Sequence, residues 1–268
     1  MLVVKIGGSP GIAADHITSD IATYVQKDEE LVIVHGGSEL ATELGHQLGY
    51  PPRFVTSVSG HSSRYTDQRT LDIFLMATAL RNRQLVAQLQ ALGVNAIGLC
   101  GMDGKLLLAR RKDTLRIVEY GKRKILREDY TGSIQEVNHT LLCTLIESGL
   151  TPIIAPVALS KSGEPLNVDG DRAAAYIAAA LGAQHLVILS NVPGLLIDIA
   201  DEHSAIPCLP TSELGTAIET IAQGSMKRKL IGAREALEGG VSQVILADGR
   251  KAKPITRALQ GQGTLISG

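Results

Sequence analysis

Two glycine-rich turns near the beginning of the chain have the composition of a phosphate-binding crevice. Each follows a short apolar run, residues 2–6 or 31–34, and each leads into a segment with helical spacing. Because glycine has no side chain, an anion can reach the backbone N–H groups of such a turn, toward which the positive end of the following helix also points. Lys5, just before the first turn, adds a full positive charge where charge develops during phosphoryl transfer. These residues predict a small-molecule kinase, and the glycines concerned are Gly7, Gly8, Gly36 and Gly37.

Three later segments place polar and cationic residues after apolar runs or at helix starts. Asn167 and Asp171 precede an alanine-rich helical stretch, and residues 224–229 contain three cations in six positions. Helix capping by Asp171 and a solvated helix start near Lys229 are the structural alternatives. The segment 190–195 follows another buried run and is suited to holding a nucleotide base or ribose. Its candidate residues are Ser190, Asn191, Val192, Gly194 and Leu195.

The histidines and cysteines show no metal-ligand spacing. His35, directly before Gly36, is predicted to be a structural hydrogen-bonding residue of the turn. A Mg²⁺ ion is therefore expected to arrive with a nucleotide and to be held chiefly by phosphate oxygens.

Six short, nearly continuous apolar runs alternate with helix-length amphipathic segments. The alternation predicts an open α/β/α sandwich around a mainly parallel sheet. The predicted strands are residues 2–6, 31–34, 96–99, 152–155, 186–189 and 244–247. The predicted helices are residues 12–25, 40–48, 66–92, 135–147, 172–181 and 229–238.

The alternation is interrupted in two places. Between Lys105 and Arg127, alternating strands around Gly121 predict a β-hairpin excursion from the sheet. Residues 160–165 break the order again and predict a boundary between an N-terminal lobe, 1–165, and a C-terminal lobe, 166–268. The first lobe is expected to bind an acyl amino acid and the second to bind ATP.

The composition indicates a globular chain whose net charge is too small to attract it to nucleic acid or to a membrane. Its 268 residues are 44% hydrophobic and carry a formal net charge of −1. Aromatic residues make up 3%, which leaves no stacking platform for nucleic acid. A cytoplasmic location is expected, because there is no leader at Met1, no apolar run long enough to span a bilayer, and no CxxC spacing among three cysteines. These are Cys100, Cys143 and Cys208.

Positive charge is concentrated in residues 105–127. This segment has nine basic and two acidic residues, a net +7, so the rest of the chain carries −8. Complementary potentials steer protein association, and the segment therefore predicts a dock for an acidic partner, with a solvated basic hairpin as the alternative. The expected docking residues are Lys105, Arg110, Arg111, Lys122, Arg123 and Lys124.

Taken together and in this order, these motifs resemble those of the amino acid kinase family, and more narrowly of its acylglutamate kinase branch, across essentially the whole chain. The resemblance implies that Lys5 and Lys229 flank the transferring phosphoryl group and that Asp171 positions both lysines. Gly8 and Gly37 would donate backbone hydrogen bonds to that group.

The resemblance also implies the roles of the remaining residues. Arg64 would clamp a substrate carboxylate with its planar guanidinium, and Asn167 would hold the α side of the substrate beside Gly36 and Gly37. The ATP site would be lined by Gly7, Ser190, Asn191, Val192, Gly194, Leu195, Gly224 and Met226.

Within the branch, the chain is most similar to the kinases of lysine biosynthesis that act on α-aminoadipate attached to an amino-group carrier protein. The segments that carry this similarity are 53–56, 63–67, 95–99, 130–133 and 167–171. The acetylglutamate kinases usually have Gly-Leu-Arg-Val-Thr at residues 62–66, a third glycine in place of Ser38, and Asp in place of Asn191. The carriers of this pathway are acidic, in agreement with the basic segment.

The implied reaction is attack by a side-chain carboxylate of an N-blocked amino acid on the γ-phosphorus of MgATP, giving an acyl phosphate and ADP. Carrier-linked L-2-aminoadipate is the leading substrate, and carrier-linked L-glutamate differs by one methylene, worth about 1–3 kcal/mol of discrimination. N-acetyl-L-glutamate phosphorylation in arginine biosynthesis is the second hypothesis, and a non-catalytic kinase-like sensor subunit is the third. Because the extra N-terminal helix of hexameric, arginine-inhibited members is missing, a homodimer insensitive to arginine is expected.

Overall fold

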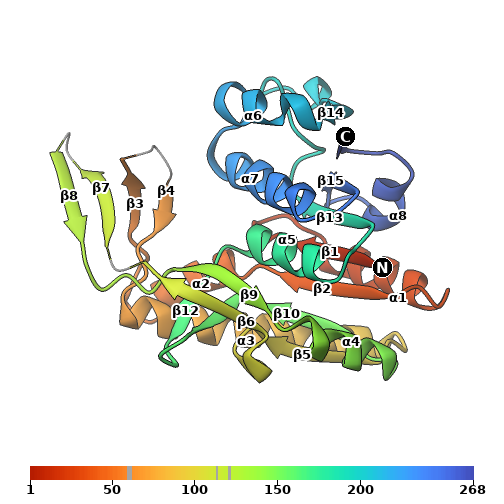
Figure 1. The fold of residues 1–268 in the computed structure, drawn as a ribbon, viewed down its shortest axis with the longest axis horizontal. Coiled ribbons are helices and arrows are strands. Elements are labelled where there is room, and N and C mark those ends of the chain that lie inside the picture. The colour runs from red at the N-terminus through yellow and green to blue at the C-terminus, as the bar shows by residue number, and fades with distance from the viewer. Residues whose placement is uncertain (59–61, 113, 120–121) are drawn as a thin grey trace.

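A largely parallel sheet forms the centre of the molecule (Figure 1). The computed structural model describes residues 1–58, 62–112, 114–119 and 122–268, and eight strands of the central sheet fall within them. The pair β15–β16 is antiparallel, and each other neighbouring pair is parallel. In spatial order the strands are β14 (Cys208–Pro210), β16 (Thr264–Ser267), β15 (Gln243–Asp248), β13 (His185–Ser190), β1 (Leu2–Ile6), β2 (Leu31–His35), β10 (Thr151–Ala155) and β5 (Ala96–Cys100).

The six strands predicted from apolar runs are all present in this sheet. Every residue of β1, β2 and β10 is buried, as expected for parallel strands that are covered on both faces. Side chains alternate between the faces, so Val3 joins one hydrophobic cluster while Leu2 and Val4 join the other.

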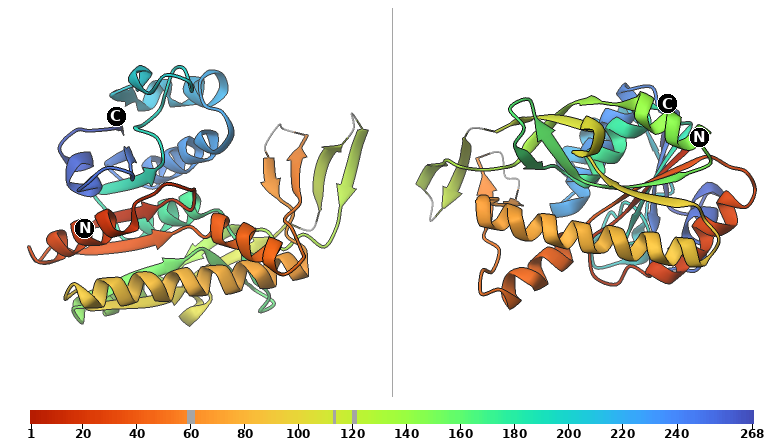
Figure 2. Two further views of the ribbon diagram at one scale, coloured as in Figure 1. Left: turned by 180° about the vertical axis from the view of Figure 1, so that it is seen from behind. Right: turned by 90° about the horizontal axis from the view of Figure 1, so that it is seen from below.

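Helices cover both faces of the sheet. On one face lie α1 (Ala14–Val25), α3 (Gln68–Ala91) and α8 (Pro254–Leu259), whose buried residues share a cluster with Leu2 and Val4. Figure 2 shows the long helix α3 lying along this face. The other face carries α4 (His139–Glu147), α5 (Gly170–Ala180), α6 (Thr211–Thr220) and α7 (Gly224–Glu238). The predicted α/β/α sandwich is therefore confirmed, with α2 (Ser38–Gln47) packed against α3.

The helix predicted at 135–147 is wrong over its first turn. Residues Gly132–Val137 form strand β9, and α4 begins only at His139. Buried Ile134 is followed by exposed Gln135 and Glu136, and the Asn138 side chain accepts a hydrogen bond from the Leu141 amide at 3.2 Å, which caps α4.

Two smaller sheets extend the central body. One has the order β12 (Pro165–Asn167), β11 (Val157–Ser160), β6 (Leu107–Arg111) and β9. The other, the projecting sheet, stands out from the body in Figure 1. Its order is β4 (Ser62–Arg64), β3 (Phe54–Ser57), β7 (Leu115–Glu119) and β8 (Lys122–Leu126).

The predicted hairpin corresponds to the antiparallel pair β7–β8. Gly121, around which it was expected to turn, lies outside the described residues. The first part of the basic segment, β6, belongs to the other small sheet, so the excursion is narrower than 105–127. Short 3-10 turns occupy Asp103–Lys105 and Glu202–Ser204. Over the part of the chain that the structure describes, no helix is both long and apolar enough to cross a membrane.

Candidate active site

A cleft of about 760 Å³ opens at the carboxyl ends of β1 and β2. The crevice outside the carboxyl ends of the strands is the usual place for a ligand in an open parallel sheet. Eight of the residues predicted from the sequence line it together: Lys5, Gly8, Gly36, Gly37, Arg64, Asn167, Asp171 and Lys229.

One carboxylate holds two lysines at the base of this cleft. Lys5 Nζ lies 2.6 Å from Asp171 Oδ1, and Lys229 Nζ donates a hydrogen bond to Oδ2 at 3.0 Å. The three side chains are only 7–9% exposed. Two full positive charges therefore face the cleft with fixed positions.

Three elements that are distant in sequence bring this lysine–aspartate cluster together. Lys5 is near the end of β1, Asp171 is in the first turn of α5, and Lys229 is in the second turn of α7. The helices can approach because Gly232 faces Asp171, and a Cβ at Gly232 would lie 3.2 Å from the Asp171 backbone.

Asp169, and not Asp171, caps helix α5. Its Oδ1 accepts hydrogen bonds from the amides of Asp171 at 2.9 Å and Arg172 at 3.1 Å. The carboxylate of Asp171 is thereby left to the lysines, and the helix-capping alternative for Asp171 does not hold.

Burial and charge act in opposite directions on the pKa values of Asp171 and Lys5. Burial alone would raise the pKa of Asp171, but Lys229 and Lys5 hold that pKa well below its usual range. Burial lowers the pKa of Lys5, and Asp171 opposes this effect. The carboxylate is thus the group that offsets the effect of burial on the Lys5 ammonium.

The two glycine turns approach each other closely beside the cluster. A Cβ at Gly8 would lie 2.9 Å from the Gly37 nitrogen, and one at Gly36 would lie 2.7 Å from the Gly8 nitrogen. The Glu39 amide donates to the Gly8 carbonyl at 3.1 Å, which joins the turns. Within the described residues, the amides of Gly8 and Gly37 donate to no protein acceptor. Two unpaired N–H groups next to two lysines have the arrangement that an anion site requires.

His35 supports the second turn from below. It is fully buried, its Nδ1 hydrogen-bonds the Gly36 carbonyl at 3.1 Å, and Asn82 donates to its Nε2 at 3.2 Å. Burial lowers the pKa of His35 to about 4, so the ring is neutral. This agrees with the structural role predicted for it.

Arg64 lies at the cleft wall with part of its guanidinium already engaged. Its Nη2 donates to the Ser38 carbonyl at 2.9 Å and to Thr42 Oγ1 at 2.8 Å, and the group lies 5.2 Å from the Phe54 ring centre. Across the cleft, the Asn167 side chain donates to Thr66 Oγ1 at 3.1 Å. The hydroxyl partners gave no signal in the sequence.

Arg228 is a further cleft residue that the sequence analysis did not single out. It donates to the Ser62 carbonyl at 2.9 Å, and its Nε lies 3.7 Å from Asp169 Oδ2. The side chain thus connects α7 to the projecting sheet. The run of three cations at 227–229 is the signal in the sequence that points to it.

The predicted nucleotide residues lie outside the lining of the cleft. Ser190 is buried at the end of β13, where the Gly7 amide donates to the neighbouring Leu189 carbonyl at 3.0 Å. Gly194 packs against Thr264, whose hydroxyl also accepts a hydrogen bond from the Leu195 amide at 2.8 Å. The remaining members are Asn191 and Val192 in the same segment, and Gly224 and Met226, which flank the cleft residue Ser225.

The cleft has the charge expected for an anionic ligand. Its lining contains six cationic and four acidic side chains. Across the described ranges, no group of three or more His, Cys, Asp or Glu residues is placed to hold a metal ion.

The sequence pattern of the amino acid kinase family matches residues 1–248, and the chain belongs to this family. It is 49% identical over 268 residues to the [LysW]-aminoadipate kinase of Deinococcus radiodurans, covering 100% of this chain and 91% of that protein. The protein of the same name from Thermus thermophilus is 46% identical, with 99% and 100% covered. The [LysW]-aminoadipate/[LysW]-glutamate kinase of Saccharolobus solfataricus is 39% identical, with 100% and 99% covered. The predicted family membership is confirmed.

Two solved structures of lower sequence identity share the fold. N-acetylglutamate synthase from Neisseria gonorrhoeae superposes with a TM-score of 0.81 at 25% identity, covering 100% of this chain and 59% of that chain. Giardia carbamate kinase gives a TM-score of 0.71 at 16% identity, with 99% and 98% covered, and this likeness shows the fold alone.

Proposed function

We propose that this protein is an ATP-dependent kinase that phosphorylates the side-chain carboxylate of L-2-aminoadipate linked to an amino-group carrier protein, in lysine biosynthesis. The observation that carries the proposal is the buried lysine–aspartate cluster beside two glycine turns with unpaired amides. The names of the relatives support the carrier-linked substrate, and one of them includes carrier-linked glutamate as well. Glutamate, shorter by one methylene, is therefore a second substrate of the same site.

The chemistry needs alignment and charge neutralisation but no general base. The substrate carboxylate is ionised at neutral pH, and its oxygen forms the new bond to the γ-phosphorus while the bond to the bridging oxygen breaks and ADP leaves. Lys5 and Lys229 lie on either side of the transferring group, and Asp171 fixes both. The amides of Gly8 and Gly37 would donate to its oxygens.

The nucleotide belongs to the C-terminal half in this proposal, with residues 166–268 as the ATP lobe and 1–165 as the substrate lobe. Gly7 and the segment Ser190, Asn191, Val192, Gly194 and Leu195 would line the ATP site with Gly224 and Met226. Their position at the carboxyl end of β13, next to β1, supports this. Mg²⁺ would accompany ATP, held chiefly by phosphate oxygens, and would neutralise part of their charge.

The substrate carboxylates lie on the N-terminal side. Arg64 would hold a carboxylate with guanidinium N–H groups, and Asn167 would hold the α side, next to Gly36 and Gly37. Both side chains line the cleft that contains the cluster, which supports the assignment.

The carrier protein is proposed to dock on the projecting sheet. This sheet holds Arg64 on β4 and carries Lys122 and Arg123, both exposed, on β8. Lys124 forms an ion pair with Glu119 at 2.5 Å, and Arg111 forms one with Glu164 at 2.9 Å. Because Lys124 and Arg111 are paired within the chain, they are less available to a partner protein than Lys122 and Arg123. The remaining docking candidates, Lys105 in a 3-10 turn and Arg110 on β6, lie before the hairpin and are proposed to meet the acidic carrier as well.

Charge reversal tests the dock separately from the chemistry. The double variant Lys122→Glu, Arg123→Glu should raise KM for carrier-linked substrate at least tenfold and leave the KM for ATP unchanged. The control is Lys161→Glu, an exposed lysine outside the projecting sheet. Equal effects of the two changes would overturn the dock.

The substrate assignment is tested by trapping the acyl phosphate as a hydroxamate. N-acetyl-L-glutamate, N-acetyl-L-2-aminoadipate and both carrier-linked amino acids are compared with ATP at equal concentration. Turnover confined to the carrier-linked forms is the expected result. Efficient use of free N-acetyl-L-glutamate would overturn the proposal in favour of the arginine pathway.

A homodimer is also proposed. Strand β5 is at the edge of the central sheet, and α3 beside it exposes Met76 and Leu80, which are 49% and 45% accessible. An apolar helix face next to a sheet edge is suited to a second copy. Light scattering should give twice the mass of 28.4 kDa, with no change on adding arginine, and a hexamer would contradict this.

A cytoplasmic location is the last part of the proposal. Cys100, Cys143 and Cys208 are all free thiols, and free cysteines are typical of a reducing compartment. Fractionation of the native host cell should recover the protein with the cytoplasmic enzymes, and recovery from a secreted fraction would contradict the location.

A further inference from the structure

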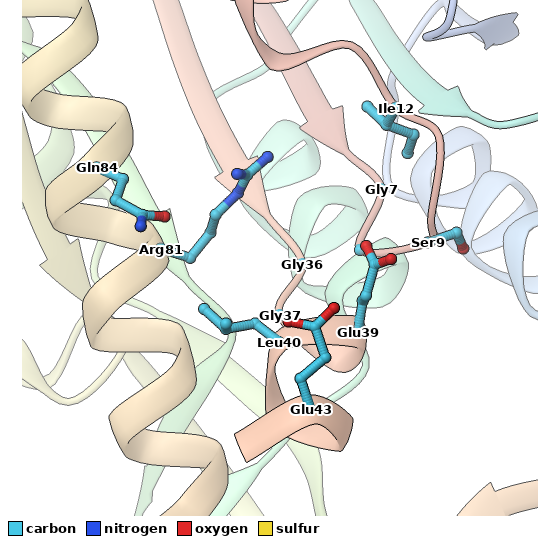
Figure 3. A pocket seen from close by; sticks show the side chains of 11 residues that line it. Gly7, Ser9, Ile12, Gly36, Gly37, Glu39, Leu40, Glu43, Arg81 and Gln84 are labelled. Carbon is cyan, nitrogen blue, oxygen red and sulfur yellow. The ribbon is translucent and has the colours of Figure 1, made fainter. Parts of the chain in front are cut away.

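A second, smaller cavity of about 190 Å³ lies between helices α2 and α3, next to the glycine turns. Figure 3 shows Glu39 and Glu43 rising from α2 on one side and Arg81 and Gln84 extending from α3 on the other. Leu40 and Ile12 supply apolar surface. The proposed phosphoryl transfer uses none of these six side chains.

Arg81 is a half-buried cation that lacks a protein partner. Over the ranges that the structure describes, its guanidinium makes neither an ion pair nor a hydrogen bond, and burial lowers its pKa while Glu39 opposes this. Leaving a charged group partly out of water without a partner costs free energy. Its planar set of N–H donors matches a carboxylate.

The opposite wall has the complementary chemistry. Glu39 and Glu43 make no ion pair with any described cation, so their carboxylates are available to an ammonium group. Two carboxylates also disfavour phosphate or a dicarboxylate in this space. The lining carries one cation and two anions, a charge that a ligand with one carboxylate and two ammonium groups would neutralise.

We propose that this cavity is a binding site for a free diamino acid, with the α-carboxylate on Arg81 and the ammonium groups on Glu39 and Glu43. Gln84 would accept or donate one further hydrogen bond, and the aliphatic part of the ligand would lie on Leu40 and Ile12. The proposed kinase reaction assigns no role to Arg81, Glu39 or Glu43, and the test of this site measures binding alone.

Isothermal titration calorimetry of the full chain with L-lysine as the probe tests the proposal. L-norleucine lacks the second ammonium group and cadaverine lacks the carboxylate, so each should bind at least tenfold more weakly than L-lysine. Arg81→Gln and, independently, Glu43→Gln should weaken lysine binding by roughly 10- to 100-fold, the worth of one charge-assisted hydrogen bond. Circular dichroism confirms that both variants fold.

The matched control is Arg83→Gln, an exposed arginine on the same helix whose Nη2 donates to the Gly98 carbonyl at 3.2 Å. This change should leave lysine affinity within twofold of the unsubstituted chain. The proposal is overturned if L-lysine does not bind, if L-norleucine binds equally well, or if Arg81→Gln and Arg83→Gln have the same effect. The cavity borders the main cleft, and both are lined by Gly8, Ser9, Gly36, Gly37, Glu39 and Glu43. Binding lost in Arg64→Lys but kept in Arg81→Gln would therefore place the ligand in the main cleft and overturn the proposal too.

Discussion

Replacing Asp171 by Asn should destabilise the protein more than any other single ion-pair change, because one carboxylate serves two buried cations. Lys5 and Lys229 lie 2.6 and 3.0 Å from it, and the side chains are 7–9% exposed. Removing one partner of a buried ion pair costs about 3–5 kcal/mol. We expect the free energy of unfolding at pH 7 to fall by about that amount.

The loss should shrink as the pH rises. In the variant, Asp171 no longer raises the pKa of Lys5, so that pKa falls further below the value of the unfolded chain. A lysine whose pKa is lower in the folded than in the unfolded chain destabilises the folded state. This penalty is complete below the folded-state pKa and shrinks as the pH approaches the unfolded-state pKa of about 10.4. At about pH 9.5 the variant should therefore recover part of its stability relative to the unsubstituted protein.

Urea unfolding followed by circular dichroism at both pH values measures these effects. The matched control is Glu235→Gln, which breaks the pair between Arg172 and Glu235 that joins the same two helices. Those side chains are 30% and 20% exposed, so the control should cost about 1 kcal/mol or less. Equal losses in the two variants, or a loss from Asp171→Asn that does not change with pH, would refute the reasoning.

Three further predictions concern turnover. Gly8→Ala should lower kcat at least tenfold with the fold retained. The added Cβ would lie 2.9 Å from the Gly37 nitrogen and displace an amide that is proposed to face the phosphoryl group. An unchanged kcat would contradict the proposed anion site. Arg64→Lys should raise KM for the carboxylate substrate about tenfold, since an ammonium cannot reproduce the bidentate contact, and an equal rise in KM for ATP would contradict this. Because burial lowers the pKa of Lys5, kcat should decline with rising pH below the ordinary lysine value of 10.5, and a decline only above it would count against a catalytic Lys5.

The central sheet and much of the site could be predicted from the sequence because each rests on local patterns. Runs such as 31–34 and 244–247 are continuous and apolar, which is typical of strands buried on both faces. Glycine pairs directly after two such runs indicate the two turns that line the cleft. Lys5 was identified because it is adjacent to one of those turns.

Long-range pairing could not be predicted in the same way. Strand β3 pairs with β7 about sixty residues later, and the contacts that select this partner lie in neither segment alone. Whether Asp169 or Asp171 caps the helix also depends on contacts between elements that are distant in the sequence. Both are acidic residues at the start of α5, and only the approach of β1 and α7 shows that Asp171 faces the lysines.

The most direct test of the account is to compare ATP binding and turnover in Lys229→Ala. Lys229 is assigned to the transferring phosphoryl group and not to the base or ribose, so the affinity for ATP should stay within a few fold. Formation of acyl phosphate, trapped as the hydroxamate, should fall by about 10²–10³-fold, which is the effect of removing one group that stabilises a transition state. Full turnover in this variant would contradict the assigned chemistry. Loss of ATP binding together with turnover would instead move Lys229 into the nucleotide site.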